Sequence, residues 1–322
     1  MSAYSRYLVV IFVTIALVAL SDAILLQRSA IYLGHGIATV AAKGIALGAV
    51  FLGLSELLYQ VMRRATGVLG DILMRVSEGL QSIGIFLMLL FMFQPASGLY
   101  MFLAAAAQTP LMDGTMAAMD RSIGFNWPAT VEAANSSPLL ASILTASYGS
   151  VLYQVLLVLI FHASMGGQAR FFEFAATLVV ALFMTTTMSM LVPTAGAYSY
   201  YQPQASSYSH FTAVGGFAHL ETLRQLRSLA PYEFTLSKLV GLISFPSFHT
   251  SLGILIVFAV RRTFLFLPAV LVNAAMIAAT IPEGGHHFMD VIGGAIVAVI
   301  SIILIRWVGK EADTLRDHVS VI

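Results

Sequence analysis

Two short polar segments near the C-terminus carry side chains that are suited to chemistry. The first is Ser244-Phe-Pro-Ser-Phe-His-Thr250, which contains His249, and the second is Gly284-Gly-His-His-Phe-Met-Asp290, which contains His286. Both lie in apolar surroundings, where an ionisable side chain costs roughly 2.5–3.5 kcal/mol on membrane-insertion scales, so a functional role is the default hypothesis. Serine, histidine and aspartate in such segments indicate covalent phosphoryl transfer through a histidine.

The spacing within these segments predicts a role for each side chain. His286 and Asp290 are four residues apart, so they share one face of a helix. The carboxylate can accept a hydrogen bond from one ring nitrogen, which fixes the tautomer and leaves the other nitrogen free as a nucleophile. His249 then protonates the departing alkoxide as the general acid. Ser247, with the backbone N–H groups around Phe248, is expected to hold phosphate oxygens at a helix start.

A metal site is the alternative for the same side chains. His249, His286, His287 and Asp290 offer imidazole and carboxylate groups, which bind divalent ions. The histidine–aspartate spacing is explained without an ion, so we expect neither a metal nor a cofactor. His287 lies about 100° around the helix from His286, and we expect it to pack or to support the site.

The composition places these segments in a membrane protein. The chain of 322 residues is 59% hydrophobic and 10% charged, whereas soluble domains average about 25% charged. The net charge of +1 and the lack of a basic tail give no indication of nucleic-acid binding. The absence of cysteine excludes disulfides and thiolate metal sites. We therefore expect an all-α polytopic membrane helix bundle.

Eight apolar windows predict membrane-spanning helices. They lie near residues 7–26, 40–62, 80–106, 139–161, 171–192, 240–260, 264–281 and 288–307. The first window is expected to remain as a span rather than a cleaved signal peptide, because its apolar run continues to Leu26. Gln94-Pro95 predicts a kink or break in the third window. We expect two N-terminal spans within residues 1–78 and a catalytic membrane domain over residues 79–322.

Basic residues predict the orientation of this bundle. The pairs Arg63-Arg64 and Arg261-Arg262 lie at span ends, which favours a cytoplasmic N-terminus in the inner (plasma) membrane. Both polar segments then reach the periplasmic or exterior face. The span near 264–281 would run down and back, and so bring His249 and His286 together.

The two polar segments resemble the second and third signature motifs of the type 2 phosphatidic acid phosphatase (PAP2) superfamily. The resemblance is strongest to the branch that contains inositol phosphorylceramide synthases and related bacterial proteins, and it covers roughly the last third of the chain. It implies a six-helix catalytic core, here preceded by two extra spans, and a lipid phosphate or phospholipid substrate. It also implies that His286 is the nucleophile that becomes phosphohistidine, Asp290 its orienting acid and His249 the proton donor.

The chain departs from the phosphatase pattern at two places. Ala279-Thr280 stands where phosphatases carry Ser-Arg, and Phe248 stands where they carry glycine. The missing arginine removes one phosphate clamp, which favours a lipid phosphotransferase with an alcohol acceptor. The alternatives are a lipid phosphate or polyprenyl diphosphate phosphatase and, from another class, a proton-coupled transporter.

Other segments of the outer loops supply candidate partners for phosphate and lipid. Arg227, Lys238 and Arg224 are the basic residues nearest to the motifs in sequence, and arginine binds phosphate bidentately; a solvated helix face is the alternative for them. The loop 107–138 is expected to hold an interfacial helix with Trp127 at headgroup level. Four tyrosines are expected to form an interfacial belt, namely Tyr198, Tyr200, Tyr201 and Tyr208.

Overall fold

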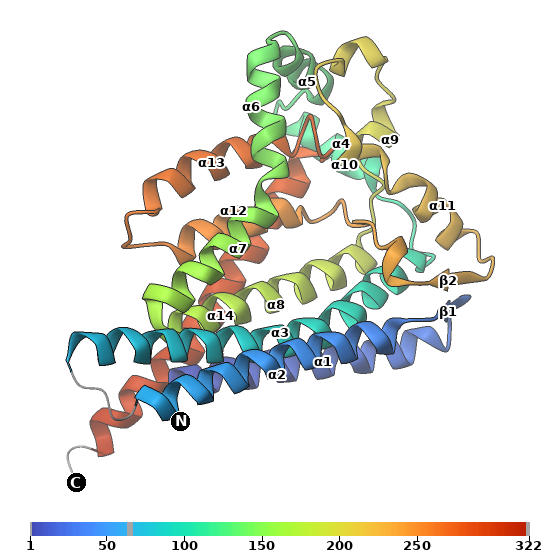
Figure 1. Cartoon of the computed structure of the whole chain (residues 1–322). Coiled ribbons are helices and arrows are strands. Elements are labelled where there is room, and N and C mark those ends of the chain that lie inside the picture. The colour runs from blue at the N-terminus through green and yellow to red at the C-terminus, as the bar shows by residue number, and fades with distance from the viewer. Residues whose placement is uncertain (1, 63–66, 320–322) are drawn as a thin grey trace.

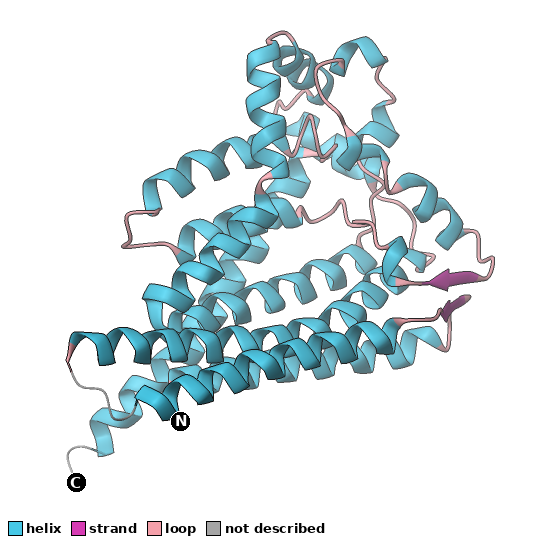
Figure 2. Cartoon of the chain, in the orientation of Figure 1, coloured by secondary structure: helices cyan, strands magenta, loops and turns pink. Residues whose placement is uncertain are grey.

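The computed structural model describes residues 2–62 and 67–319, and this part of the chain is mostly helical (Figures 1 and 2). Five long helices of this described part lie alongside one another. They are α1 (Ala3–Leu26), α2 (Ile37–Met62), α3 (Val68–Ala106), α8 (Gly167–Leu191) and α14 (Phe288–Val319). The prediction of an all-α polytopic bundle is confirmed.

The number of full-length spans is smaller than predicted. Five helices in the described part are long and apolar enough to cross a membrane, and they lie within the long helices just named. A sixth span results if α6 (Pro138–Gly149) and α7 (Val151–Phe161) are counted as one span with a 49° bend, after which a π-helical turn, η1 (His162–Gly166), leads into α8. These helices confirm a multi-pass membrane protein.

The windows near 240–260 and 264–281 do not form full-length spans. They contain α12 (Phe248–Ala259) and α13 (Phe266–Ala279), of 12 and 14 residues. At 1.5 Å per residue, neither reaches across an apolar layer of about 30 Å. Helix α12 starts late because Pro246 has no N–H to donate and Ser247 acts as its N-cap, its side chain accepting a hydrogen bond from the Thr250 N–H.

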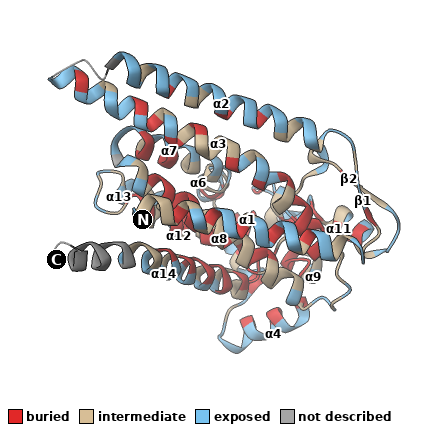
Figure 3. Ribbon diagram, turned by 90° about the horizontal axis from the view of Figure 1, so that it is seen from below, coloured by how far each residue is buried: buried red, intermediate tan, exposed pale blue. Residues whose placement is uncertain are grey.

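Helix α3 is unbroken, although Pro95 lies inside it. Membrane helices tolerate proline because neighbouring groups satisfy the freed carbonyl, so the predicted break is absent. The predicted domain boundary after residue 78 falls within this helix. Helix α2 packs against α3, and its other side is exposed (Figure 3). Many of its exposed side chains, including Val50, Leu54 and Leu57, are apolar and suit contact with lipid tails.

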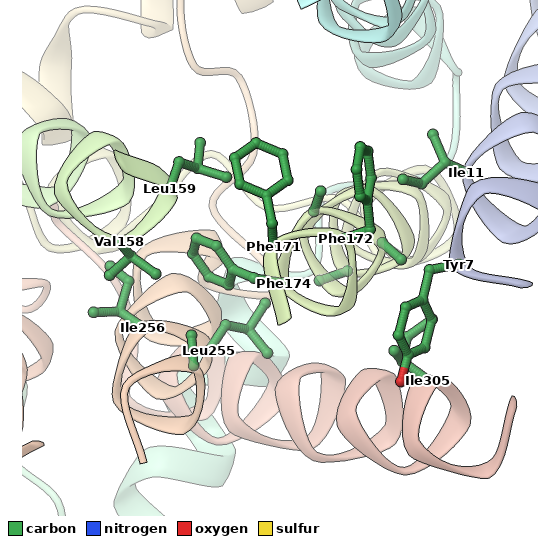
Figure 4. Close-up of a cluster of buried hydrophobic side chains, with 14 of the residues drawn as sticks. Tyr7, Ile11, Val158, Leu159, Phe171, Phe172, Phe174, Leu255, Ile256 and Ile305 are labelled. Atoms are coloured by element: carbon green, nitrogen blue, oxygen red, sulfur yellow. The ribbon is translucent and has the colours of Figure 1, made fainter. Parts of the chain in front are cut away.

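The main hydrophobic core lies between α1, α7, α8, α12 and α14 (Figure 4). Phe171, Phe172 and Phe174 of α8 are buried at its centre, with Leu255 of α12 and Ile305 of α14 beside them. This packing holds the two short motif-bearing segments against long helices, because α12 contacts both α8 and α14.

The remaining segments gather at the end of the bundle opposite to both chain termini (Figure 1). They comprise α4 (Asp113–Ser122), α5 (Trp127–Asn135), α9 (Ala197–Tyr201), η2 (Ala205–Tyr208), α10 (Val214–Phe217), α11 (Leu220–Arg227) and η3 (Leu236–Lys238). Strands β1 (Ile31–Leu33) and β2 (Tyr232–Phe234) pair in parallel, with Ile31 opposite Tyr232. These segments bring residues far apart in the chain to the region where α12 and α14 begin.

Candidate active site

The two polar segments meet at one cavity of about 450 Å³. His249 lies in the first turn of α12, and His286 lies in the loop that leads from α13 into α14. Both imidazoles line the cavity, together with Ser244. The chain therefore leaves α12, runs out and back through α13, and returns His286 to His249, as the sequence predicts.

Asp290 makes a hydrogen bond with the Nδ1 atom of His286. Its Oδ2 lies 3.2 Å from His286 Nδ1 and also accepts hydrogen bonds from Ser244 Oγ at 3.2 Å and from the His287 N–H at 2.9 Å. Asp290 is fully buried, and all three contacts go to Oδ2, whereas its Oδ1 has no hydrogen-bond partner among the described residues. With Nδ1 engaged, the Nε2 lone pair of His286 is the one available for attack.

The surroundings keep the imidazole of His286 neutral. Burial, with a smaller contribution from the charge of His287, lowers its pKa to about 4, while hydrogen bonding to the Ser244 backbone works in the opposite direction. A neutral imidazole at neutral pH has a free lone pair, which is the reactive form of a histidine nucleophile.

His249 faces the same cavity and is held by an aromatic ring. Its imidazole stacks on the ring of Tyr148, with centroids 4.2 Å apart and planes inclined by 17°. A Cβ atom added at Gly284 would lie 3.0 Å from the Tyr148 hydroxyl oxygen and 3.0 Å from Cδ2 of His286. The Tyr148 hydroxyl and Cδ2 of His286 are therefore at most twice that distance apart. Tyr148 thus lies near both histidines on the cavity wall.

His287 lies outside the cavity, buried between two carboxylates. Its Nε2 is 3.5 Å from Asp113 Oδ1 and its Nδ1 is 3.6 Å from Asp120 Oδ2. Burial alone would lower the pKa of His287, but the contact with Asp113 and the charges of Asp290, Asp113 and Asp120 raise it. A charged His287 balances these carboxylates in a supporting position.

The two carboxylates also fix the backbone around the motif. Asp120 accepts hydrogen bonds from the Phe288 and Met289 N–H groups, at 3.1 and 3.0 Å, and so caps the start of α14. Asp113 accepts from the Ala195 and Gly196 N–H groups, at 2.9 and 2.8 Å. The sequence feature that could have indicated Asp113 and Asp120 is their spacing of seven residues, which places two acidic side chains on one face of a helix.

Two aromatic residues expected at the membrane interface are buried beside the motif instead. Trp127 is fully buried and donates its Nε1–H to the carbonyl oxygen of His286 at 3.0 Å. Tyr198 is 1% exposed and donates its hydroxyl to the carbonyl of Pro282. The interfacial placement of these two side chains is therefore wrong, because tertiary contacts with the motif loop satisfy their polar groups.

Two further cavity residues escaped the sequence analysis. Glu283 precedes His286 by three residues and is 3% exposed; an acidic residue beside a motif in an apolar stretch was the available signal. His219 is buried and its Nε2–H donates to the Ala195 carbonyl at 2.8 Å. Burial lowers the pKa of His219, with hydrogen bonding to Ala195 acting in the opposite direction.

Four residues predicted to bind phosphate do not line this cavity. Ser247 is fully buried as the N-cap of α12. Arg227 donates to the carbonyls of Ala107 and Thr109, at 2.6 and 2.8 Å, and lines a separate cavity of about 700 Å³ together with Arg224. Arg224 pairs with Glu221 at 3.1 Å and Lys238 with Glu233 at 3.2 Å. Their phosphate-binding role stays a prediction.

The described wall of the histidine cavity lacks the basic side chains that usually bind phosphate. Among the described residues that line it, none is a lysine or arginine. Nor does the described part of the chain contain a group of three or more His, Cys, Asp or Glu side chains placed to hold a metal ion.

A comparison with protein families agrees with the geometry. A family model described as the PAP2 superfamily matches residues 114–304, which is more than half of the chain. The matched region runs from α4 into α14 and contains His249, His286 and Asp290. Searches of curated proteins and of solved structures found no match to this chain. The protein is a multi-pass membrane enzyme that belongs to the PAP2 superfamily, whose members are phosphatases and phosphotransferases.

Proposed function

We propose that this enzyme transfers a phosphoryl-containing group from a lipid through a covalent phosphohistidine at His286. One observation carries the proposal: His286 and His249 line one cavity, while Asp290 occupies the Nδ1 side of His286. This is the arrangement in which a nucleophile, its orienting carboxylate and a proton donor can act on one phosphorus atom.

The reaction would proceed in two balanced steps. In the first, Nε2 of His286 attacks phosphorus, an N–P bond forms, and the P–O bond to the leaving group breaks. His249 gives its proton to the departing oxygen. In the second, His249 takes the proton of an incoming hydroxyl, whose oxygen attacks phosphorus, and the N–P bond breaks to release neutral His286.

We favour an alcohol over water as the acceptor, as in inositol phosphorylceramide synthases. Ala279-Thr280 replaces the phosphatase Ser-Arg pair, and Thr280 is buried with its hydroxyl donated to the Ile277 carbonyl. This position therefore offers phosphate no cation. With water as the acceptor, the same two steps would make the protein a lipid phosphate or polyprenyl diphosphate phosphatase.

We also propose that the cavity opens to the periplasmic or exterior face of the plasma membrane. The chain termini lie at the opposite end of the bundle (Figure 1). Arg261 and Arg262 lie in the turn after α12, and the positive-inside rule would place this basic turn on the cytoplasmic side. The pair Arg63-Arg64, which contributed to this prediction, lies outside the described residues.

The covalent mechanism is tested with purified enzyme and phosphorus-labelled lipids, namely phosphatidic acid and phosphatidylinositol. We expect wild-type enzyme to acquire label that is lost in acid and kept in base. His286→Asn should lower turnover by at least about 10³-fold, because the change removes the nucleophile that forms the intermediate. His35→Asn, which changes an exposed histidine after β1, is the matched control.

Two results would contradict parts of this proposal. Turnover by His286→Asn at the wild-type rate would refute the covalent route. Inorganic phosphate as the sole product, with every alcohol tried, would leave the phosphohistidine in place but reject the transferase in favour of the phosphatase.

A further inference from the structure

The carboxylate of Glu283 lies on the wall of the histidine cavity. It shares the loop before α14 with His286, and both residues line the same space. Its Oε2 accepts hydrogen bonds from Thr145 Oγ1 and from the Thr212 N–H, both at 3.1 Å, and its Oε1 accepts one from Thr212 Oγ1. All three partners donate, which is the pattern that an ionised carboxylate requires.

These contacts hold the carboxylate at a defined place. Thr145 belongs to α6, Thr212 precedes α10, and Glu283 follows α13, so three separate segments meet there. Glu283 is 3% exposed, and bulk water therefore screens its charge weakly. A phosphate that reaches His286 enters a space with a fixed negative charge in its wall.

No lysine or arginine among the described lining residues offsets this charge. Burial lowers the pKa of His249 to about 4, so His249 by itself is neutral at neutral pH. In the proposed reaction it supplies one positive charge only once a bound phosphate anion favours its protonated form. A phosphodiester carries one negative charge, which His249 balances. A phosphomonoester above its second pKa, at about 6, carries close to two, and its additional charge is repelled by Glu283.

We propose that Glu283 is a specificity-determining residue that selects phosphodiester over phosphomonoester lipids by its charge. This inference rests on the proposed function, since it concerns the substrate of the same cavity. Thr145 and Thr212 position the carboxylate. Selection for a diester also explains how a site of this kind can lack an arginine clamp.

The test uses two lipids that differ by one methyl group and one charge, dioleoylphosphatidic acid and dioleoylphosphatidylmethanol. Both release diacylglycerol, which is measured for each as kcat/KM at pH 8. Wild-type enzyme should prefer phosphatidylmethanol. Glu283→Gln should shift the ratio towards phosphatidic acid on the order of tenfold, through an absolute rise in kcat/KM for the monoester, which damage to the fold does not produce.

Two control variants separate charge from structure. Glu283→Asp keeps the charge and should keep the wild-type preference. Glu132→Gln removes a charge from the exposed face of α5 and should leave both rates unchanged. An unaltered ratio in an active Glu283→Gln enzyme, or a wild-type preference for phosphatidic acid, would overturn the inference.

A measurement on wild-type enzyme decides the case if Glu283→Gln does not fold. Turnover of phosphatidic acid, divided by that of phosphatidylmethanol, should fall as the pH rises through the second ionisation of the monoester. A ratio independent of pH rejects the charge selection. If neither lipid is turned over and His286 takes no label, the proposed function itself fails.

Discussion

At the scale of single residues, the site depends on two imidazoles that face one cavity. His286 is buried against Asp290 and has a pKa lowered to about 4. His249 reaches the same cavity from the start of α12. Burial lowers the pKa of His249 to about 4 as well, so both imidazoles by themselves are neutral at neutral pH. A phosphate anion bound beside His249 would favour its protonated form, which is the form that acts as the acid.

The lowered pKa of His286 makes a prediction about acidic solutions. In the folded protein the imidazole takes up its proton only near pH 4, whereas in the unfolded chain it does so near 6.5. Protonation of His286 should therefore not change the rate of phosphohistidine formation in a single turnover between about pH 7 and about pH 5. An acid limb with its midpoint at 6.5 that persists in His249→Gln would contradict the assignment.

The same shift predicts a loss of stability in acid. The folded-state pKa lies below the unfolded value, so the unfolded chain binds more protons between these two values. The contribution of His286 to stability is fully present above about pH 6.5 and declines as the pH falls towards 4. In His286→Asn this part of the decline in the free energy of unfolding should be absent.

At the scale of elements, the contact between α2 and α3 depends on small residues. Gly48 of α2 lies against Gly84 of α3, where an added Cβ would come within 2.7 Å of the Gly84 carbonyl oxygen. Small residues let membrane helices approach in this way. The contact is the principal attachment of α2, whose packing partner is α3.

Substitution of Gly48 tests this contact. Gly48→Ala should destabilise the protein by about 1–3 kcal/mol through overpacking. Thermal unfolding in detergent micelles should show a lower Tm. Gly53→Ala on the same helix is the matched control, since an added Cβ there meets nothing within 4 Å. Equal Tm values for the two variants would mean that α2 and α3 do not pack as closely as this.

At the scale of the whole molecule, the proposed orientation places the histidine cavity outside the cytoplasm. The chain contains no cysteine, so a single introduced cysteine reports its own side of the membrane. Ser228, after α11, and Ser164, within η1, are both exposed and lie outside the histidine cavity.

Labelling of intact cells with a membrane-impermeant maleimide tests the orientation. We expect Ser228→Cys to react in intact cells and Ser164→Cys to react only after permeabilisation. The labelled fraction of each, compared before and after permeabilisation, gives the result. The reverse pattern would place the cavity in the cytoplasm and would remove the argument from Arg261 and Arg262.

The sequence by itself determined the membrane class and the local part of the site. Long apolar windows predict helices because the backbone must satisfy its own hydrogen bonds in lipid. The spacing of four residues predicts the contact between His286 and Asp290, although His286 lies in the loop just before α14 and not on the helix itself. Both are properties of neighbouring residues, and they need no knowledge of what packs against them.

The tertiary structure alone decided the composition of the cavity wall. Thr145 and Glu283 are 138 residues apart in the chain, and Trp127 reaches the His286 carbonyl from 159 residues away. Arg224 and Arg227 are close to the motifs in sequence but line another cavity. Which distant side chains line the same cavity depends on how the helices pack. The spacing of residues close together in the sequence does not predict this packing.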